Sequence, residues 1–163
     1  MKLNQSASIM LSEAGVSEGQ KVLDVGCGSG NFSIPAARLV GYSGRIYALD
    51  TSRGALRKLS NKAEKEGLDN VTTLLSSGNI DIPLDTETIN HVLLIDVLQE
   101  VSQKKILLKE AHRVLEPNGD VIVYPMHIDV NEVIKLASDT GFKLKDRIFQ
   151  DQILVFEKVS TIF

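Results

Sequence analysis

The sequence contains one cysteine, Cys27, so no intramolecular disulfide can form. Its three histidines are dispersed along the chain and no second cysteine accompanies them, so no metal site is expected. The start of the chain lacks the apolar segment of a secretory signal, and the longest apolar run, residues 92–95 continuing at 97–98, is too short to span a bilayer. These absences predict a cytoplasmic protein without a membrane span, a disulfide or a metal.

The composition is that of an ordinary globular domain. The chain has 163 residues, of which 43% are hydrophobic and 24% charged, with a formal net charge of −3. A domain of this length buries roughly 70% of the surface that its unfolded chain exposes. We therefore expect one domain over residues 1–163, with an N-terminal helical segment (1–18) and a core (19–163). The acidic balance disfavours a nucleic-acid partner and leaves an oligomer open.

The most informative stretch is residues 21–30, Lys-Val-Leu-Asp-Val-Gly-Cys-Gly-Ser-Gly. Its first half is a short apolar run that contains Asp24, and its second half places Gly26, Gly28 and Gly30 at alternate positions. This pattern predicts a buried strand that runs into a glycine loop, followed by a helix over residues 31–40. Open α/β sheets bind ligands where such a strand ends.

The spacing of the glycines argues against a dinucleotide. The dinucleotide fingerprint requires a third glycine three residues after the second, and position 31 is Asn. The run Arg45–Asp50 is a second apolar strand that ends in a carboxylate. An acid at this place can accept hydrogen bonds from both hydroxyls of an adenosine ribose.

The rest of the chain alternates between strand and helix patterns. The expected helices span residues 4–14, 31–40, 53–66, 102–115 and 129–140, and the expected strands after the first span residues 45–50, 71–75, 90–95, 120–124, 143–149 and 152–158. Alternation of this kind predicts a parallel sheet with helices on both faces. The last two strands are joined by a link so short that they must be antiparallel.

These motifs resemble those of a known family. Asp24-Val-Gly-Cys-Gly-Ser-Gly30, Asp50, Asp96-Val-Leu-Gln-Glu100 and Arg113-Val-Leu-Glu-Pro-Asn-Gly119 are similar to the class I S-adenosylmethionine-dependent methyltransferases. Within that class the chain looks most like the small single-domain group that includes the quinone-biosynthesis C-methyltransferases. The resemblance implies an α/β, doubly wound, Rossmann-like sheet of seven strands in the order 3-2-1-4-5-7-6, with strand 7 antiparallel and helices on both faces.

The resemblance also implies roles for individual residues. A buried acid such as Asp24 is costly unless it is paired, and the ammonium at the methionine end of S-adenosylmethionine would pair it. Asp50 would bind the ribose, although it could instead stabilise the start of the next helix. Asn79 would accept a hydrogen bond from the adenine amino group, and Asp96 would lie beside the transferable methyl. The full set of expected cofactor-binding residues is Asp24, Gly26, Cys27, Gly28, Gly30, Asp50, Thr51, Asn79, Ile80, Asp96 and Val97.

Two residues are candidates for catalysis. His127 follows the fifth strand at its carboxyl end, where a histidine could take a proton from the attacking nucleophile. Glu100, with Gln99 beside it, could orient the acceptor. His91 and His112 are expected to be structural or to face solvent, because one starts a strand and the other lies inside a helix.

The absence of certain motifs excludes some classes of methyl acceptor. The fourth strand is not followed by the Asn/Asp-Pro-Pro-Tyr pattern of enzymes that methylate the amines of bases, and no cysteine is free to attack a pyrimidine ring. The prediction is therefore methyl transfer to O, N or C of a small molecule, with S-adenosylhomocysteine as the product. Two alternatives stay open: a non-catalytic module that binds S-adenosylmethionine, and an NAD-dependent oxidoreductase.

Overall fold

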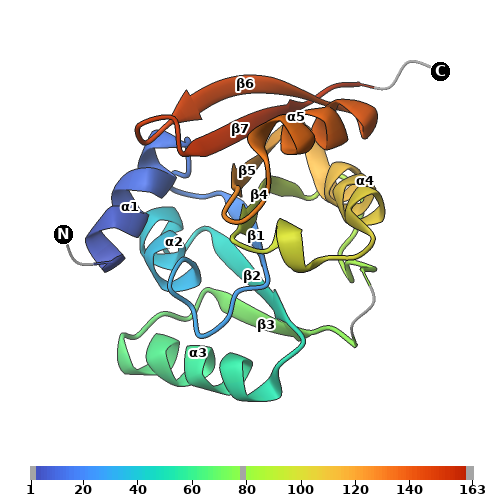
Figure 1. The fold of residues 1–163 in the computed structure, drawn as a ribbon. Coiled ribbons are helices and arrows are strands. Elements are labelled where there is room, and N and C mark those ends of the chain that lie inside the picture. Colours follow the sequence, from blue (N-terminus) through green and yellow to red (C-terminus); the bar gives the residue numbers. More distant parts are fainter. Residues whose placement is uncertain (1–2, 78–79, 161–163) are drawn as a thin grey trace. The chain divides into compact units, whose positions relative to one another are not determined.

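The computed structural model describes residues 3–77 and 80–160 (Figure 1). The predicted residue Asn79 lies outside these ranges. The contacts within the chain divide it into two compact units, Met1–Asn79 and Ile80–Phe163, which we call unit 1 and unit 2. The expectation of one domain stays a prediction. No helix in the described ranges is long and apolar enough to cross a membrane.

Unit 1 carries three helices and three parallel strands. Its elements are α1 (Leu3–Glu13), β1 (Lys21–Val25), α2 (Ser33–Val40), β2 (Arg45–Asp50), α3 (Arg53–Lys65) and β3 (Val71–Leu75). In β1, four consecutive residues are buried, as expected for a strand that is covered on both faces. The two pairings of β2 set Ala48 opposite Asp24 of β1 and Thr73 of β3. Asp24 therefore lies in the buried part of a paired strand.

The packing of α3 explains how the glycine loop is supported. The buried stripe of this helix is formed by Leu56, Leu59 and Ala63, and it packs with Cys27 and Ala48 in one apolar cluster. Ser52 caps the helix, because its Oγ accepts a hydrogen bond of 3.1 Å from the amide of Ala55. The cap and the stripe fix the helix that follows the carboxylate of Asp50.

One helix start in unit 1 was predicted wrongly. We expected a helix from Asn31, but α2 begins at Ser33. The amide of Gly30 donates to the carbonyl of Cys27 at 3.1 Å, so the chain makes a turn there before the helix can begin. The glycine loop is correspondingly longer than the sequence pattern indicated.

Unit 2 carries the remaining four strands. Its elements are β4 (Ile89–Ile95), a short 3-10 helix η1 (Leu98–Glu100), α4 (Lys104–Val114), β5 (Leu115–Tyr124), α5 (Val130–Asp139), β6 (Phe142–Ile148) and β7 (Ile153–Lys158). β4 and β5 are parallel, and β7 runs antiparallel to both β5 and β6. The predicted antiparallel pair at the end of the chain is thus confirmed. Asp129 caps α5, because its carboxylate accepts from the amides of Asn131 and Glu132.

The boundary between α4 and β5 was also predicted wrongly. We expected the helix to continue to Leu115 and the strand to begin at Asp120, but β5 begins at Leu115. Leu115 pairs with Ile89, the register then shifts, and Asp120 pairs with His91. The Pro-Asn-Gly sequence, which lies between the expected helix and the expected strand, is therefore part of an irregularity inside β5.

The seven strands are ordered β3-β2-β1-β4-β5-β7-β6. This is the order implied by the family resemblance, and β7 is the antiparallel strand. The predicted fold class, a doubly wound α/β sheet, is confirmed. In such a fold the loops that follow β1, β2 and β4 are where a ligand is expected.

Candidate functional site

The site in unit 1 begins with a buried carboxyl group. Asp24 is 2% exposed, and the hydroxyl of Ser33, itself fully buried, donates to its Oδ2 at 2.6 Å. Burial raises the pKa of Asp24 from 3.8 to about 7; the Ser33 hydrogen bond opposes the rise, and the charge of Asp50 adds to it. A cation beside Asp24 would favour the ionised form, because it would supply the pairing that the protein interior lacks.

The start of the glycine loop is tied to the end of β2. The amides of Gly26 and Cys27 both donate to the carbonyl of Leu49, at 2.8 and 3.0 Å. The side chain of Cys27 is buried, and its Sγ lies 3.5 Å from the carbonyl of Gly28. Burial and the nearby charge of Asp24 raise the pKa of the Cys27 thiol far above its ordinary value. Cys27 can therefore serve a ligand through its backbone and is not a nucleophile.

Two glycines of the loop are required for different reasons. Gly28 has φ +55°, and a Cβ placed on it would meet no atom of the described residues within 4 Å. Gly30 has φ +98°, and a Cβ there would lie 2.3 Å from Cδ1 of Leu59. Gly30 thus permits the loop to pack on α3, whereas Gly28 borders open space. Open space over a glycine is where a ligand can approach the backbone closely.

Asp50 is held against this open face of the loop. Its Oδ2 accepts a hydrogen bond of 2.9 Å from the amide of Gly28, and its Oδ1 accepts one of 2.9 Å from the amide of Ser52. Each carboxylate oxygen can accept more than one hydrogen bond, so both keep capacity for ribose hydroxyls. Thr51, the next predicted residue, is exposed. The groups in unit 1 fit the adenosine and methionine ends of S-adenosylmethionine.

In unit 2, the predicted residues after β4 form a hydrogen-bonded turn. Asp96 has φ +54° and its amide donates to the carbonyl of Tyr124 at 3.1 Å. The side-chain amide of Gln99 donates to Oδ1 and to the backbone carbonyl of Asp96, at 2.6 and 3.1 Å. Glu100 is exposed, and Val97 is half-buried. The turn thus holds Asp96 in a strained backbone conformation and leaves Glu100 accessible to solvent.

The remaining predicted residues lie apart from these hydrogen bonds. His127 is exposed and has φ +60°, three residues after the end of β5. Ile80 is half-buried at the start of the segment that leads to β4. Among the residues that the structure describes, no three or more His, Cys, Asp or Glu side chains gather where they could hold a metal ion.

The two other histidines make structural contacts. His91 is buried and pairs with the buried carboxylate of Asp120 on the neighbouring strand. His112 contacts the carbonyl of Val159 at 3.0 Å, and its ring meets that of Phe142 edge-on with centroids 5.4 Å apart. The partner of His91 was missed because only the strand register sets Asp120 opposite it.

The chain is similar to known methyltransferases. The methyltransferase domain family matches residues 16–157. The demethylmenaquinone methyltransferase of Anoxybacillus flavithermus is 36% identical over 107 residues, which are 66% of this chain and 45% of that protein. A probable cobalt-precorrin-6B C(15)-methyltransferase (decarboxylating) of Saccharolobus solfataricus is 28% identical over 144 residues, 87% of this chain and 71% of that protein.

A solved structure agrees with these matches. A SAM-dependent methyltransferase from Aquifex aeolicus superposes with a TM-score of 0.81 at 25% identity and covers 93% of this chain and 88% of that one. The chain belongs to the methyltransferase domain family. The predicted class, a class I S-adenosylmethionine-dependent methyltransferase, is confirmed, and S-adenosylmethionine is the cofactor that this membership supports. The chain spans about half the length of the demethylmenaquinone methyltransferases that it matches, from 44% to 57%.

Proposed function

We propose that this chain transfers a methyl group from S-adenosylmethionine to an O, N or C atom of a small molecule. The single observation that carries the proposal is the geometry around Gly28. Its amide orients the Asp50 carboxylate at 2.9 Å, and the space above its Cα is open. That arrangement suits the ribose of an adenosine, and the family supplies the identity of the nucleoside.

Unit 1 would bind the cofactor at two points. Asp50 would accept hydrogen bonds from the ribose hydroxyls, and Asp24 would pair with the ammonium of the methionine end, directly or through water. The backbone of Gly26, Cys27, Gly28 and Gly30 would line the loop, with Thr51 beside the adenosine. When bound, S-adenosylmethionine supplies an activated methyl group on a sulfonium. The task of the protein is then to hold the acceptor in line and to exclude water.

Four more residues are proposed to contact the cofactor. We propose Asn79 and Ile80 as neighbours of the adenine, and Asp96 and Val97 as neighbours of the methionine end. His127 is proposed as the general base that takes the proton of the acceptor, which its exposure permits. Glu100 is proposed to orient the acceptor, and the turn fixed by Gln99 would hold it in place.

The acceptor is proposed to be small and partly apolar. The names of two relatives specify organic acceptors, demethylmenaquinone and a cobalt-precorrin, and the second name specifies a carbon position. Leu98, Tyr124 and Met126 are proposed to flank the methyl site; Leu98 is buried, Tyr124 is half-buried and Met126 is exposed. The cytoplasmic location, the absence of a nucleic-acid partner and the oligomeric state stay predictions.

Calorimetry tests whether the chain binds the proposed cofactor. We expect micromolar binding of S-adenosylmethionine and of S-adenosylhomocysteine, with NAD as the matched adenosine-containing control that does not bind. Binding of NAD without binding of either sulfur compound would contradict the proposal and favour an oxidoreductase.

A second experiment tests catalysis and the acceptor. Metabolite fractions are screened by thermal shift in the presence of S-adenosylhomocysteine, and each stabilising compound is then assayed for turnover of S-adenosylmethionine. We expect at least one small molecule that stabilises the protein and is methylated. Binding of the cofactor with no turnover in any fraction supports the non-catalytic module, and stabilisation only by structured RNA or a protein overturns the small-molecule acceptor.

A further inference from the structure

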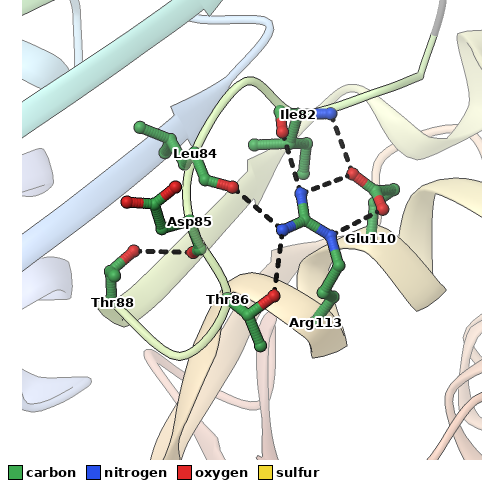
Figure 2. Close-up of polar contacts among 7 residues, drawn as sticks. All are labelled: Ile82, Leu84, Asp85, Thr86, Thr88, Glu110 and Arg113. Carbon is green, nitrogen blue, oxygen red and sulfur yellow. Dashed lines mark hydrogen bonds and ion pairs between the residues drawn. The ribbon is translucent and has the colours of Figure 1, made fainter.

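Residues 80–88 of unit 2 connect to β4 without forming a helix or a strand. The backbone polar groups of such a segment must still find partners, because buried N–H and C=O groups are rarely left unpaired. Ile82 is 3% exposed, so its backbone groups cannot rely on solvent. The last turn of α4 supplies the partners (Figure 2).

The guanidinium of Arg113 donates hydrogen bonds to three acceptors in residues 80–88. It donates to the carbonyls of Ile82 and Leu84, each at 2.9 Å, and to Oγ1 of Thr86 at 3.3 Å. Figure 2 shows the planar group enclosed by these oxygens on one side and by Glu110 on the other. The fixed fork of donors on an arginine suits this task, whereas a lysine ammonium would act only as a point charge.

Glu110 completes the arrangement from the same helix. Both of its carboxylate oxygens accept from Arg113 at 2.9 Å, and Oε2 also accepts from the amide of Ile82 at 2.9 Å. The hydrogen bond with Arg113 holds the pKa of Glu110 below its ordinary value, so the group is ionised at neutral pH. The amide and the carbonyl of Ile82 are therefore both held by charged side chains, whose hydrogen bonds are stronger than neutral ones.

The backbone of α4 holds the far end of the same segment. The amides of Glu87 and Thr88 donate to the carbonyls of Arg113 and Val114, at 3.0 and 2.8 Å. These carbonyls lie at the end of the helix, where no partner within the helix is available to them. The segment is thus fixed at Ile82 by side chains and at residues 87–88 by the backbone.

We propose that Arg113 and Glu110 are positioning residues for cofactor binding, which act through the Ile82 backbone on Ile80 and so on the adenine. The proposal rests on the proposed function, in which Ile80 borders the adenine. Two residues of chain reach at most about 7 Å, so a backbone fixed at Ile82 restricts where Ile80 can lie. Loss of the two charged side chains would free Ile80 while leaving Asp24 and Asp50 of unit 1 in place.

The test separates this role from a general loss of stability by measuring selectivity for adenine. The probes are S-adenosylhomocysteine and its analogue in which hypoxanthine replaces adenine, and the variants are Arg113→Lys and Glu110→Gln. The wild type should bind the adenine compound more tightly than the analogue. In both variants the ratio of the two dissociation constants should fall by about 3- to 10-fold, because one hydrogen bond contributes that much. Glutamine has no charge and one acceptor oxygen in place of two, so one of the two hydrogen bonds from Arg113 is lost and the amide NH2 group faces the guanidinium.

Arg38→Lys is the matched control. Arg38 also donates twice to a glutamate, Glu66, but it contacts no part of residues 80–88 in the hydrogen bonds that the structure describes. This variant should keep the wild-type ratio. If Arg113→Lys does not fold, Thr86→Val removes one acceptor of Arg113 and should lower the ratio by a smaller factor.

Three outcomes would overturn the inference. They are an unchanged ratio in the variants, an equal loss of affinity for both compounds, and a wild type that does not distinguish the two bases. If instead the wild type binds neither compound, the proposed function itself fails. Failure of the positioning role is thus distinguishable from failure of the cofactor assignment.

Discussion

The amide of Gly28 donates a 2.9 Å hydrogen bond to the carboxylate of Asp50, which lies 22 residues later in the sequence. This contact connects the loop after β1 with the end of β2. It holds the Asp50 carboxylate next to Gly28, over which the space is open. The carboxylate is therefore oriented by the protein before a ligand arrives. Groups oriented in advance bind more tightly, because their ordering costs less on association.

Gly28→Ala should weaken cofactor binding with only a moderate loss of stability. The left-handed conformation at φ +55° costs an alanine about 1–2 kcal/mol, and the added methyl group fills the space where the ligand approaches. We expect the dissociation constant for S-adenosylhomocysteine to rise by at least about 10-fold, equivalent to about 1.4 kcal/mol. Calorimetry and urea denaturation measure the two effects.

Gly67→Ala is the matched control for this prediction. Gly67 has φ +67°, and a Cβ there would also meet no atom of the described residues within 4 Å, but it follows α3 and lies outside the glycine loop. The control should lose a similar amount of stability and keep the wild-type affinity. Equal affinities in the two variants would contradict the placement of the ligand over Gly28.

Asp50→Ala should weaken cofactor binding by roughly 10- to 1000-fold. Two hydrogen bonds to a charged acceptor contribute about 1.5–3 kcal/mol each, and water compensates part of the loss. The measurement is calorimetric titration with S-adenosylhomocysteine.

Ser52→Ala separates ribose binding from stabilisation of α3. The Ser52 hydroxyl is the actual cap of the helix, so its loss should cost about 0.5–2 kcal/mol of stability without changing the affinity. If Asp50→Ala lowers stability and leaves the dissociation constant unchanged, Asp50 serves the start of α3 and not the cofactor.

Local signals in the sequence predicted much of this fold. The bounds of β2 and β3 agree with the prediction, because each is an apolar or β-branched run flanked by polar or turn residues. The carboxylate at the end of β2 and the three glycines could also be found, since a strand followed by a glycine loop is a pattern of neighbouring residues. The order of the strands came from the resemblance to a family.

Long-range contacts explain what the sequence did not show. β5 begins at Leu115 because Leu115 pairs with Ile89, whereas the sequence pattern predicted a strand only from residue 120. The role of Arg113 could not be predicted either. Its carbonyl partners at Ile82 and Leu84 lie 31 and 29 residues earlier, and every residue has a backbone carbonyl, so the sequence does not show which carbonyls are used.

Asp24→Asn should stabilise the ligand-free protein at pH above 7 and weaken cofactor binding. The unfolded chain loses the Asp24 proton near pH 3.8, whereas burial raises the pKa in the folded state to about 7. The stability from this group is thus fully present below pH 3.8 and is lost as pH rises through about 7. Asparagine cannot ionise, and its oxygen can still accept from Ser33, so the gain at pH 8 could reach about 4 kcal/mol.

Cofactor binding should show the opposite pH dependence. Pairing with an ammonium requires the ionised form of Asp24. As the pH is raised toward 7, the wild-type affinity should therefore increase by up to about 10-fold per pH unit, and it should level off above pH 7. In Asp24→Asn this dependence should vanish. Ser33→Ala is the control, because the loss of its 2.6 Å hydrogen bond should move the same transition to higher pH. A wild-type affinity that is constant from pH 6 to 8 would show that Asp24 does not pair with the ligand.

His127→Asn should lower turnover of the acceptor by roughly 10²–10⁴-fold, the usual contribution of a general base. Asparagine is a suitable replacement, because it tolerates the left-handed backbone of His127 at φ +60° and cannot accept a proton at neutral pH. The affinity for S-adenosylhomocysteine should stay at the wild-type value, since His127 is not proposed to contact the cofactor. The decline of kcat on the acidic side of the pH profile should disappear in the variant.

His112→Asn is the matched control for the loss of an imidazole elsewhere in unit 2. His112 packs on Phe142 and contacts the carbonyl of Val159, so its replacement should lower the unfolding temperature and leave kcat and its pH profile unchanged. The acceptor for both assays is the one identified by the thermal-shift screen. If His127→Asn keeps wild-type turnover at every pH, no proton is taken by His127, and the reaction then depends on in-line placement of an acceptor that is already deprotonated or needs no base.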